Sequence, residues 1–215
     1  MIQLEVWGPY ALFTRGEMKV ERASYDVPTP SAARGIVESI YLHPGMRWVI
    51  RRIYVLNPIE FTTIRRNEVK SKILGGTAMR IAQSKEDEPY LVTTKQIVQR
   101  ASMVLTNVHY VIEAEFEMLP EKAAPGDNPG KFQDIVTRRM RKGQCFSTPY
   151  FGCREFPAHF KQWEGGPIPT IDETRDLGFM LYDFDYSDPQ NITPLYFRAK
   201  MEHGVIQVAG CEVFK

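Results

Sequence analysis

The sequence contains little cysteine and no pair of cysteines at metal-binding spacing. Its 215 residues include three cysteines, Cys145, Cys153 and Cys211, and no C-x-x-C motif. Such an odd and sparse set predicts neither a disulfide framework nor a cysteine zinc site. We therefore expect a reduced protein of the cytoplasm.

Long apolar runs and nucleotide-binding motifs are also missing. No window approaches the ~18 to 20 apolar residues of a membrane span. Glu5 interrupts the apolar N-terminus, so we expect neither a signal peptide nor contact with a membrane. No G-x-G-x-x-G or P-loop motif is present, and no two histidines lie two or four residues apart. The sequence therefore predicts no cofactor and no metal site.

The charge is balanced overall but uneven along the chain. A formal net charge of +1 excludes a uniformly basic nucleic-acid coat protein and an acidic tail protein. Residues 47–80 carry eight basic side chains against two acidic ones, and residues 131–142 carry five against one. Residues 164–188 carry seven acidic side chains against one basic. This pattern predicts one face that binds a polyanion, although charges scattered over a solvated surface would give the same counts.

Apolar periodicity predicts a chain of strands with two helices. Alternation or β-branched composition indicates strands at residues 2–7, 47–56, 60–73 and 104–118, and further strands at 177–186, 194–201 and 204–210. Three-and-four spacing indicates a helix over residues 32–42, with Ser31 as its N-cap, and a basic helix over about 131–142. Residues 75–100 lack clear periodicity and are interpreted as an insertion. The order of the first six elements is one strand short of the ferredoxin-like plan.

Four side chains have positions that suggest chemistry. Tyr41 ends the first predicted helix, and Lys131 opens the second, where backbone N–H groups favour phosphate. The alternatives are a buried core tyrosine and a solvated lysine. Asp183 and Asp185 would share one face of a strand, as a metal pair does, or would simply end a solvated strand.

Several segments resemble one protein family in order and spacing. They are FTRGEMKVERASYDVPTPSAARGIVESIYLHP at 13–44, VHYVIEAEF at 108–116, GKF at 130–132 and FGCREF at 151–156. These resemble the CRISPR-associated protein 5 family, subtype d, of type I-C systems, over roughly the first three quarters of the chain.

This resemblance implies an α+β fold. It consists of a ferredoxin-like N-terminal domain of the RAMP superfamily and an appended antiparallel β-sheet domain, which we place at residues 1–145 and 146–215. It also implies an endoribonuclease that cuts precursor CRISPR RNA at the base of the repeat stem-loop. The product would stay bound, together with the other subunits of the type I-C interference complex.

The resemblance further implies a catalytic group of a tyrosine, a lysine and a histidine. Tyr41 and Lys131 match the first two, but Phe132 occupies the position of the histidine. We expect His43, two residues after Tyr41, or His109, in the strand at 104–118, to act in its place. The basic stretches predict phosphate contacts from arginines, which suit phosphate oxygens. The candidates are Arg51, Arg52, Arg65, Arg66, Arg138, Arg139 and Arg141.

Two other functions remain open at this point. Because Phe132 stands where the family has a histidine, the chain lacks one group that carries a proton. Such a chain could be a non-catalytic scaffold that binds the repeat-derived tag of the RNA. A subunit that binds duplex DNA in the same complex is the third reading.

Overall fold

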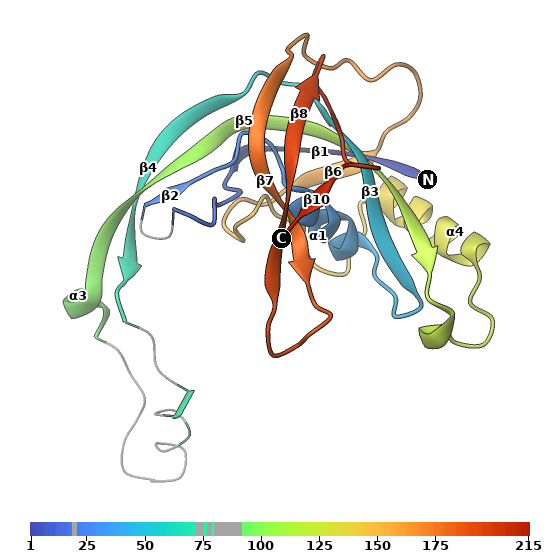
Figure 1. The fold of residues 1–215 in the computed structure, drawn as a ribbon, viewed down its shortest axis with the longest axis horizontal. Coiled ribbons are helices and arrows are strands. Elements are labelled where there is room, and N and C mark those ends of the chain that lie inside the picture. The colour runs from blue at the N-terminus through green and yellow to red at the C-terminus, as the bar shows by residue number, and fades with distance from the viewer. Residues whose placement is uncertain (19–20, 72–74, 77–78, 80–91) are drawn as a thin grey trace.

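The alternating segments of the chain form one large, mostly antiparallel sheet (Figure 1). The computed structural model describes residues 1–18, 21–71, 75–76, 79 and 92–215. Within them the sheet has ten strands, with helices α1 (Pro30–Ile40), α3 (Thr93–Gln96) and α4 (Pro129–Lys142). The strands are β1 (Ile2–Ala11), β2 (Arg22–Ala23), β3 (Met46–Val55), β4 (Glu60–Val69), β5 (Ile97–Met118), β6 (His159–Gln162), β7 (Arg175–Asp185), β8 (Thr193–Glu202), β9 (Val205–Gln207) and β10 (Val213–Phe214). The α+β class is therefore confirmed.

Four strands form the part of the sheet that carries the two longer helices. Their order across the sheet is β3, β5, β1, β6, and each neighbouring pair is antiparallel. β6 lies beyond residue 145 and completes this group at the edge of β1. Side chains at alternate positions, such as Leu4, Val6, Ile112 and Ala114, are buried on the helix-bearing face. Because β9 pairs with β3, the C-terminal strands continue the same sheet.

Helix α1 begins two residues before the position that the sequence predicts. Thr29, not Ser31, is the N-cap, and its hydroxyl accepts a hydrogen bond from the Ala32 N–H at 3.1 Å. Pro30 occupies the first turn, where its missing N–H costs nothing and its fixed φ suits a helix. Ala33, Ile36, Val37 and Ile40 form the buried stripe that the spacing predicts.

Helix α4 has well-defined signals at both ends. The Asn128 side chain caps it by accepting from the Lys131 N–H at 2.9 Å, and Gly143 ends it in the left-handed region at φ 62°. Phe132, Val136 and Met140 are buried against the sheet. The three side chains recur at four-residue spacing, so the opposite face of α4 is left to the solvent with its basic residues.

Strand β5 is 22 residues long and joins two parts of the molecule. Its second half lies in the middle of the helix-bearing sheet, and its first half pairs with β4 to form an arm that extends away from the body (Figure 1). The insertion expected at 75–100 falls mainly outside the described residues, but positions 97–100 belong to β5. Residues 97–103 are mostly exposed or half-buried, and no strand is predicted there from the sequence. No helix in the described part of the chain is long and apolar enough to cross a membrane.

Candidate active site

Tyr41 lies where helix α1 ends, and several contacts fix it there. Its backbone is extended and closes the helix through an N–H bond to the Val37 carbonyl at 3.1 Å. Its own carbonyl accepts from the indole N–H of buried Trp48 at 2.8 Å. Its side chain is buried, and the Arg139 guanidinium lies 5.1 Å from the centre of its ring. Tyr41 is thus held by a strand and by helix α4 as well as by its own helix.

Two loops meet beside Tyr41 because Gly45 has no side chain. One loop follows α1 and the other precedes α4. The Leu119 N–H donates to the Gly45 carbonyl at 2.8 Å, and a Cβ on Gly45 would lie 2.9 Å from the Ala123 Cα. Real Cβ atoms do not approach backbone that closely, so any other residue at this position would force the loops apart.

Asp127 connects the basic side chains of the two loops. Its Oδ1 accepts from the Lys131 ammonium at 2.9 Å, and its Oδ2 accepts from the Ala124 N–H at 2.8 Å. His43 Nδ1 lies 3.6 Å from the same carboxylate and accepts from the Gly45 N–H at 3.1 Å. These contacts lower the pKa of Asp127 and raise that of Lys131, mainly through the hydrogen bond that they share. The Lys131 side chain is nevertheless about half exposed and open to a ligand.

Phe132 fills the position that the resemblance assigns to a histidine. Its side chain is buried, and its ring centre lies 6.0 Å from that of Tyr41 and 4.8 Å from that of His43. The Phe116 ring of β5 meets it edge-on, with ring centres 6.1 Å apart. Phe132 therefore forms the apolar floor below Tyr41 and His43, and it has no group that could carry a proton.

The environment of Tyr41 raises the pKa of its hydroxyl. Burial is the largest cause, while the nearby cations of Lys131 and Arg139 act in the opposite direction. Because burial outweighs the cations, the phenol is neutral at physiological pH. Tyr41, His43, Asp127 and Lys131 thus form one cluster with a neutral hydroxyl, an imidazole and a carboxylate-bound ammonium. We call this group the Tyr41 cluster.

His109 lies outside the Tyr41 cluster. It is seven positions before Phe116 along β5, a separation of roughly 23 Å at the usual strand rise. The odd offset also places it on the sheet face opposite the helices. There its Nε2 lies 2.9 Å from a carboxylate oxygen of Glu5. Of the two histidines proposed to replace the missing one, the fold brings only His43 to Tyr41.

The seven candidate arginines are dispersed, and four of them bind a glutamate or a backbone carbonyl of the protein. Arg51, Arg52 and Arg66 pair with Glu115, Glu113 and Glu155 respectively, and Arg139 donates to the Ile40 carbonyl at 2.6 Å while packing on Tyr41.

The other three are exposed. Arg141 donates to the Gln162 side chain at 3.0 Å. Arg65 and Arg138 have no ion pair within the described ranges.

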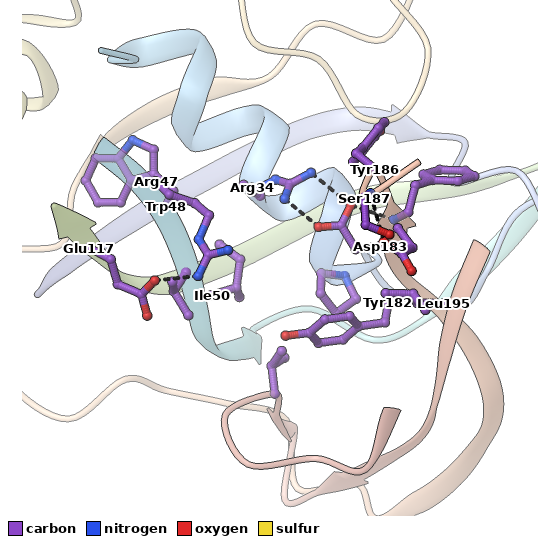
Figure 2. A pocket seen from close by; sticks show the side chains of 15 residues that line it. Arg34, Arg47, Trp48, Ile50, Glu117, Tyr182, Asp183, Tyr186, Ser187 and Leu195 are labelled. Carbon is purple, nitrogen blue, oxygen red and sulfur yellow. Dashed lines mark hydrogen bonds and ion pairs between the residues drawn. The ribbon is translucent and has the colours of Figure 1, made fainter. Parts of the chain in front are cut away.

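A separate pocket of about 560 Å³ lies between α1, β3 and β7 (Figure 2). Figure 2 shows the Arg34 guanidinium facing the Asp183 carboxylate and Arg47 facing Glu117, and both pairs are hydrogen-bonded. Asp185 pairs with Lys215 at 2.6 Å. Asp183 and Asp185 therefore each bind a protein cation. No group of three or more metal-ligating side chains is gathered within the described ranges.

Asp127 and Gly45 are functional candidates that the sequence analysis did not identify. Asp127 stands four residues before Lys131, a spacing typical of helical ion pairs, but the helix cap at Asn128 falls between them. Gly45 reads in the sequence only as a residue that ends a helix. Their importance depends on the second loop, which is some eighty residues away along the chain, and no local pattern could have revealed it.

Solved structures share this fold over the whole chain. A structure described as a CRISPR-associated protein matches with a TM-score of 0.70 at 23% identity, covering 100% of this chain and 96% of that one. A functionally uncharacterized protein, SMU1763c from Streptococcus mutans, matches with a TM-score of 0.69 at 22% identity, covering 100% and 96%. At these identities the likeness concerns the fold alone.

Sequence relatives are closer. A protein of Mannheimia succiniciproducens named CRISPR pre-crRNA endoribonuclease Cas5d is 46% identical over 214 residues, covering 96% of this chain and 94% of its own. A protein of the same name from Thermus thermophilus is 36% identical, covering 96% and 90%. The family model described as CRISPR-associated protein (Cas_Cas5), subtype Cas5d, matches residues 1–209. The chain therefore belongs to the Cas5d family of CRISPR-associated proteins.

Proposed function

We propose that the chain is an endoribonuclease that cleaves precursor CRISPR RNA at the repeat stem-loop without a metal ion. In this proposal it keeps its product and serves as a subunit of the type I-C interference complex. The observation that carries the proposal is the meeting of Tyr41, His43 and Lys131 around Asp127, although Lys131 is ninety positions from Tyr41 in sequence. The names of the two sequence relatives support the same activity and substrate.

RNA carries its own nucleophile, which makes a metal unnecessary. The 2′-hydroxyl attacks the adjacent phosphorus, the bond to the 5′-oxygen breaks, and the products are a 2′,3′-cyclic phosphate and a 5′-hydroxyl. A protein has to align the two oxygens, stabilise the extra charge on the phosphate, and let one proton leave and another arrive.

Lys131 is suited to stabilise the charge. It stands in the first turn of α4, where the helix dipole already favours an anion, and its ammonium is half exposed. Asp127 fixes the position of the ammonium and raises its pKa, so Lys131 stays charged over the working range of pH. Asp127 acts as a positioning residue in this scheme.

Tyr41 is suited to orient the 2′-hydroxyl. Because burial raises its pKa, Tyr41 is a hydrogen-bonding phenol and a poor base. We assign it the alignment of the nucleophile, and the 2′-proton passes to the solvent. The packing of Arg139 and Phe132 on its ring holds the hydroxyl in place.

His43 is suited to protonate the leaving group. Its Nδ1 accepts from the Gly45 N–H, so neutral His43 carries its proton on Nε2. For the ring to act as an acid, Nδ1 takes up a second proton and gives up the Gly45 bond. Asp127, 3.6 Å from Nδ1, is then its counter-ion, and Nε2 can give its proton to the 5′-oxygen. In this way His43 would supply what Phe132 cannot.

Binding of the RNA would use the exposed face of α4. Lys131, Arg138 and Lys142 follow at seven- and four-residue intervals, which places them along one side of the helix. From Lys131 to Lys142 this row extends roughly 16 Å at 1.5 Å per residue. Arg141 borders the same face, and Arg65 offers a further cation on the arm.

The topology supports a ferredoxin-like unit within the sheet. β1, α1, β3, β5, α4 and β6 follow one another as in the βαββαβ plan, and their strands have the order β3, β5, β1, β6. We place the end of this unit after β6, not at residue 145, because the fourth strand comes from residues 159–162. The C-terminal domain would then consist of β7–β10.

A binding assay with cleavage scored in parallel tests the proposal. Repeat RNA, scrambled RNA and duplex DNA are each incubated with the protein in EDTA, and products are mapped to the nucleotide. We expect cleavage of repeat RNA at one position near the stem base. Tight binding of repeat RNA without cleavage would instead support the scaffold function that the buried Phe132 keeps open. Preferential binding of duplex DNA would support the third function.

A further inference from the structure

The face of the sheet opposite the helices carries a pocket that the proposed cleavage does not use. It measures about 420 Å³ and lies where β1, β5 and β6 run side by side (Figure 1). Its walls include Trp7, Asn57, Asn107, His109, His159 and Lys161. A volume of this size suits a single small ring system or nucleotide.

Three flat rings line this pocket. The rings of Trp7 and His159 are stacked, with centres 5.7 Å apart and planes inclined by 26°. The His109 ring meets Trp7 edge-on at 6.1 Å. His159 is exposed and Trp7 is half-buried, so this stack ends at the solvent. Aromatic and imidazole rings at a surface are the platforms on which proteins stack unpaired bases.

Two amide side chains stand beside the rings. Asn57 donates to the Asn107 carbonyl at 2.8 Å through its amide nitrogen, and among the described residues no group donates to its amide oxygen. The Asn107 side chain makes no hydrogen bond within the described ranges. Asn107 also has φ 47°, a left-handed conformation in the middle of a strand that asparagine adopts more readily than other residues with a side chain. This conformation sits between the arm and the body, at the pocket wall.

The charges of the pocket favour a neutral ligand over a free anion. Buried Glu5 lies 2.9 Å from His109 Nε2 and 3.3 Å from the Lys161 ammonium, so its carboxylate offsets the lysine. An isolated phosphate or carboxylate would meet this buried negative charge. A base has no charge, and its edge needs the donors and acceptors that two amides supply.

From the rings, the amides and the offset charge we infer that this pocket holds one unpaired base of a single-stranded RNA segment. The inference rests on the proposed function, since that makes RNA the ligand of the chain. The pocket and the Tyr41 cluster lie on opposite faces of the sheet, so a strand held here belongs to a part of the RNA away from the scissile phosphate.

Fluorescence of the full chain tests the inference with a defined probe. In a Trp163→Phe background, the remaining tryptophans are Trp7 and the buried Trp48. We expect an eight-nucleotide oligouridine to quench the emission saturably and an abasic ribose-phosphate strand of equal length not to do so. Duplex DNA should not displace the oligouridine. Quenching by the abasic strand, or displacement by duplex DNA, would overturn the inference.

Binding by variants gives a second readout. Trp7→Ala should weaken oligouridine binding roughly 5- to 150-fold, the range of one base-stacking contact. Trp7→Phe should retain most of the affinity, and His159→Ala, at an exposed position, should weaken binding without threatening the fold. Phe179→Ala removes an exposed ring on β7 and is the matched control, with unchanged binding expected. Wild-type affinity in His159→Ala, with Trp7→Ala either binding normally or failing to fold, would refute the stack.

The two proposals can fail separately. If repeat RNA is cut but oligouridine leaves Trp7 emission unchanged, the pocket assignment is wrong and the nuclease stands. If oligouridine quenches Trp7 but repeat RNA is never cut, the chain holds RNA and the nuclease assignment is wrong.

Discussion

The carboxylate of Asp127 holds the ammonium of Lys131 at 2.9 Å, and the Asp127 side chain is only 1% exposed. A hidden carboxylate thus carries a lysine that faces the solvent. The same carboxylate lies beside His43, so one acidic group organises both basic residues of the site.

Replacing Asp127 by asparagine should change the pH dependence of cleavage. Asp127 raises the pKa of Lys131, so its loss lowers that pKa and Lys131 loses its charge at a lower pH. The alkaline limb of the single-turnover rate profile should therefore move to lower pH. Asp134→Asn, an exposed change on helix α4, is the matched control. An alkaline limb that stays in place in Asp127→Asn would remove Asp127 from its positioning role.

Replacing His43 by asparagine should slow cleavage by roughly 10²- to 10⁴-fold, the usual contribution of a general acid. RNA binding should change little, because His43 is not among the exposed cations. His203→Asn alters an exposed histidine that pairs with Asp172 and should cleave normally. Full activity of His43→Asn would mean that another group protonates the leaving oxygen.

Replacing Gly45 by alanine should destabilise the protein and the site together. The added methyl group would lie 2.9 Å from the Ala123 backbone, and relief requires the two loops to separate. We expect a loss of about 1 to 3 kcal/mol in the free energy of unfolding, measured in urea, and a lower cleavage rate. Gly35→Ala is the contrast, since nothing lies within 4 Å of its Cβ position in helix α1. It should raise stability by about 0.5 to 1 kcal/mol.

Replacing Arg138 by glutamine should weaken RNA binding through the loss of one phosphate contact. The slope of log affinity against log salt should become shallower by about one unit. Equilibrium binding of a repeat RNA with a 2′-deoxy scissile nucleotide, at four or more salt concentrations, measures this slope. Arg198→Gln, on the far β7–β8 hairpin, should leave the slope unchanged. An unchanged slope for Arg138→Gln would place the RNA off this face of α4.

The sequence predicted the elements of the body better than their connections. The helices carry three-and-four spacing, and the central strands have one apolar face, so local patterns revealed them. Strand β6 escaped prediction because it has four residues and forms only by pairing with β1, more than 150 positions away. Residues 97–103, the first seven of β5, escaped it because they fell in the segment interpreted as an insertion and their side chains are mostly exposed or half-buried.

The candidate site was predictable only in part. Resemblance to a family pointed to Tyr41 and Lys131, but it could not choose between His43 and His109. The structure favours His43 because His109 projects from β5 on the sheet face opposite the helices, beside Glu5 and away from Tyr41. The arginine candidates came from charge counts, which cannot distinguish an exposed guanidinium such as that of Arg138 from one bound to a glutamate, as that of Arg52 is.

The most direct test of the account is single-turnover cleavage of a repeat RNA in EDTA by the wild-type chain and by Lys131→Ala and Tyr41→Phe. If Tyr41 and Lys131 act on the RNA as proposed, the wild-type chain should release a 2′,3′-cyclic phosphate product and should not cleave RNA whose scissile nucleotide is 2′-deoxy. The cleavage rate should fall roughly 10²- to 10³-fold in Lys131→Ala, the usual effect of removing one donor that stabilises the transition-state charge. It should also fall clearly in Tyr41→Phe. Cleavage of the 2′-deoxy RNA, or wild-type rates in both variants, would contradict the proposed mechanism.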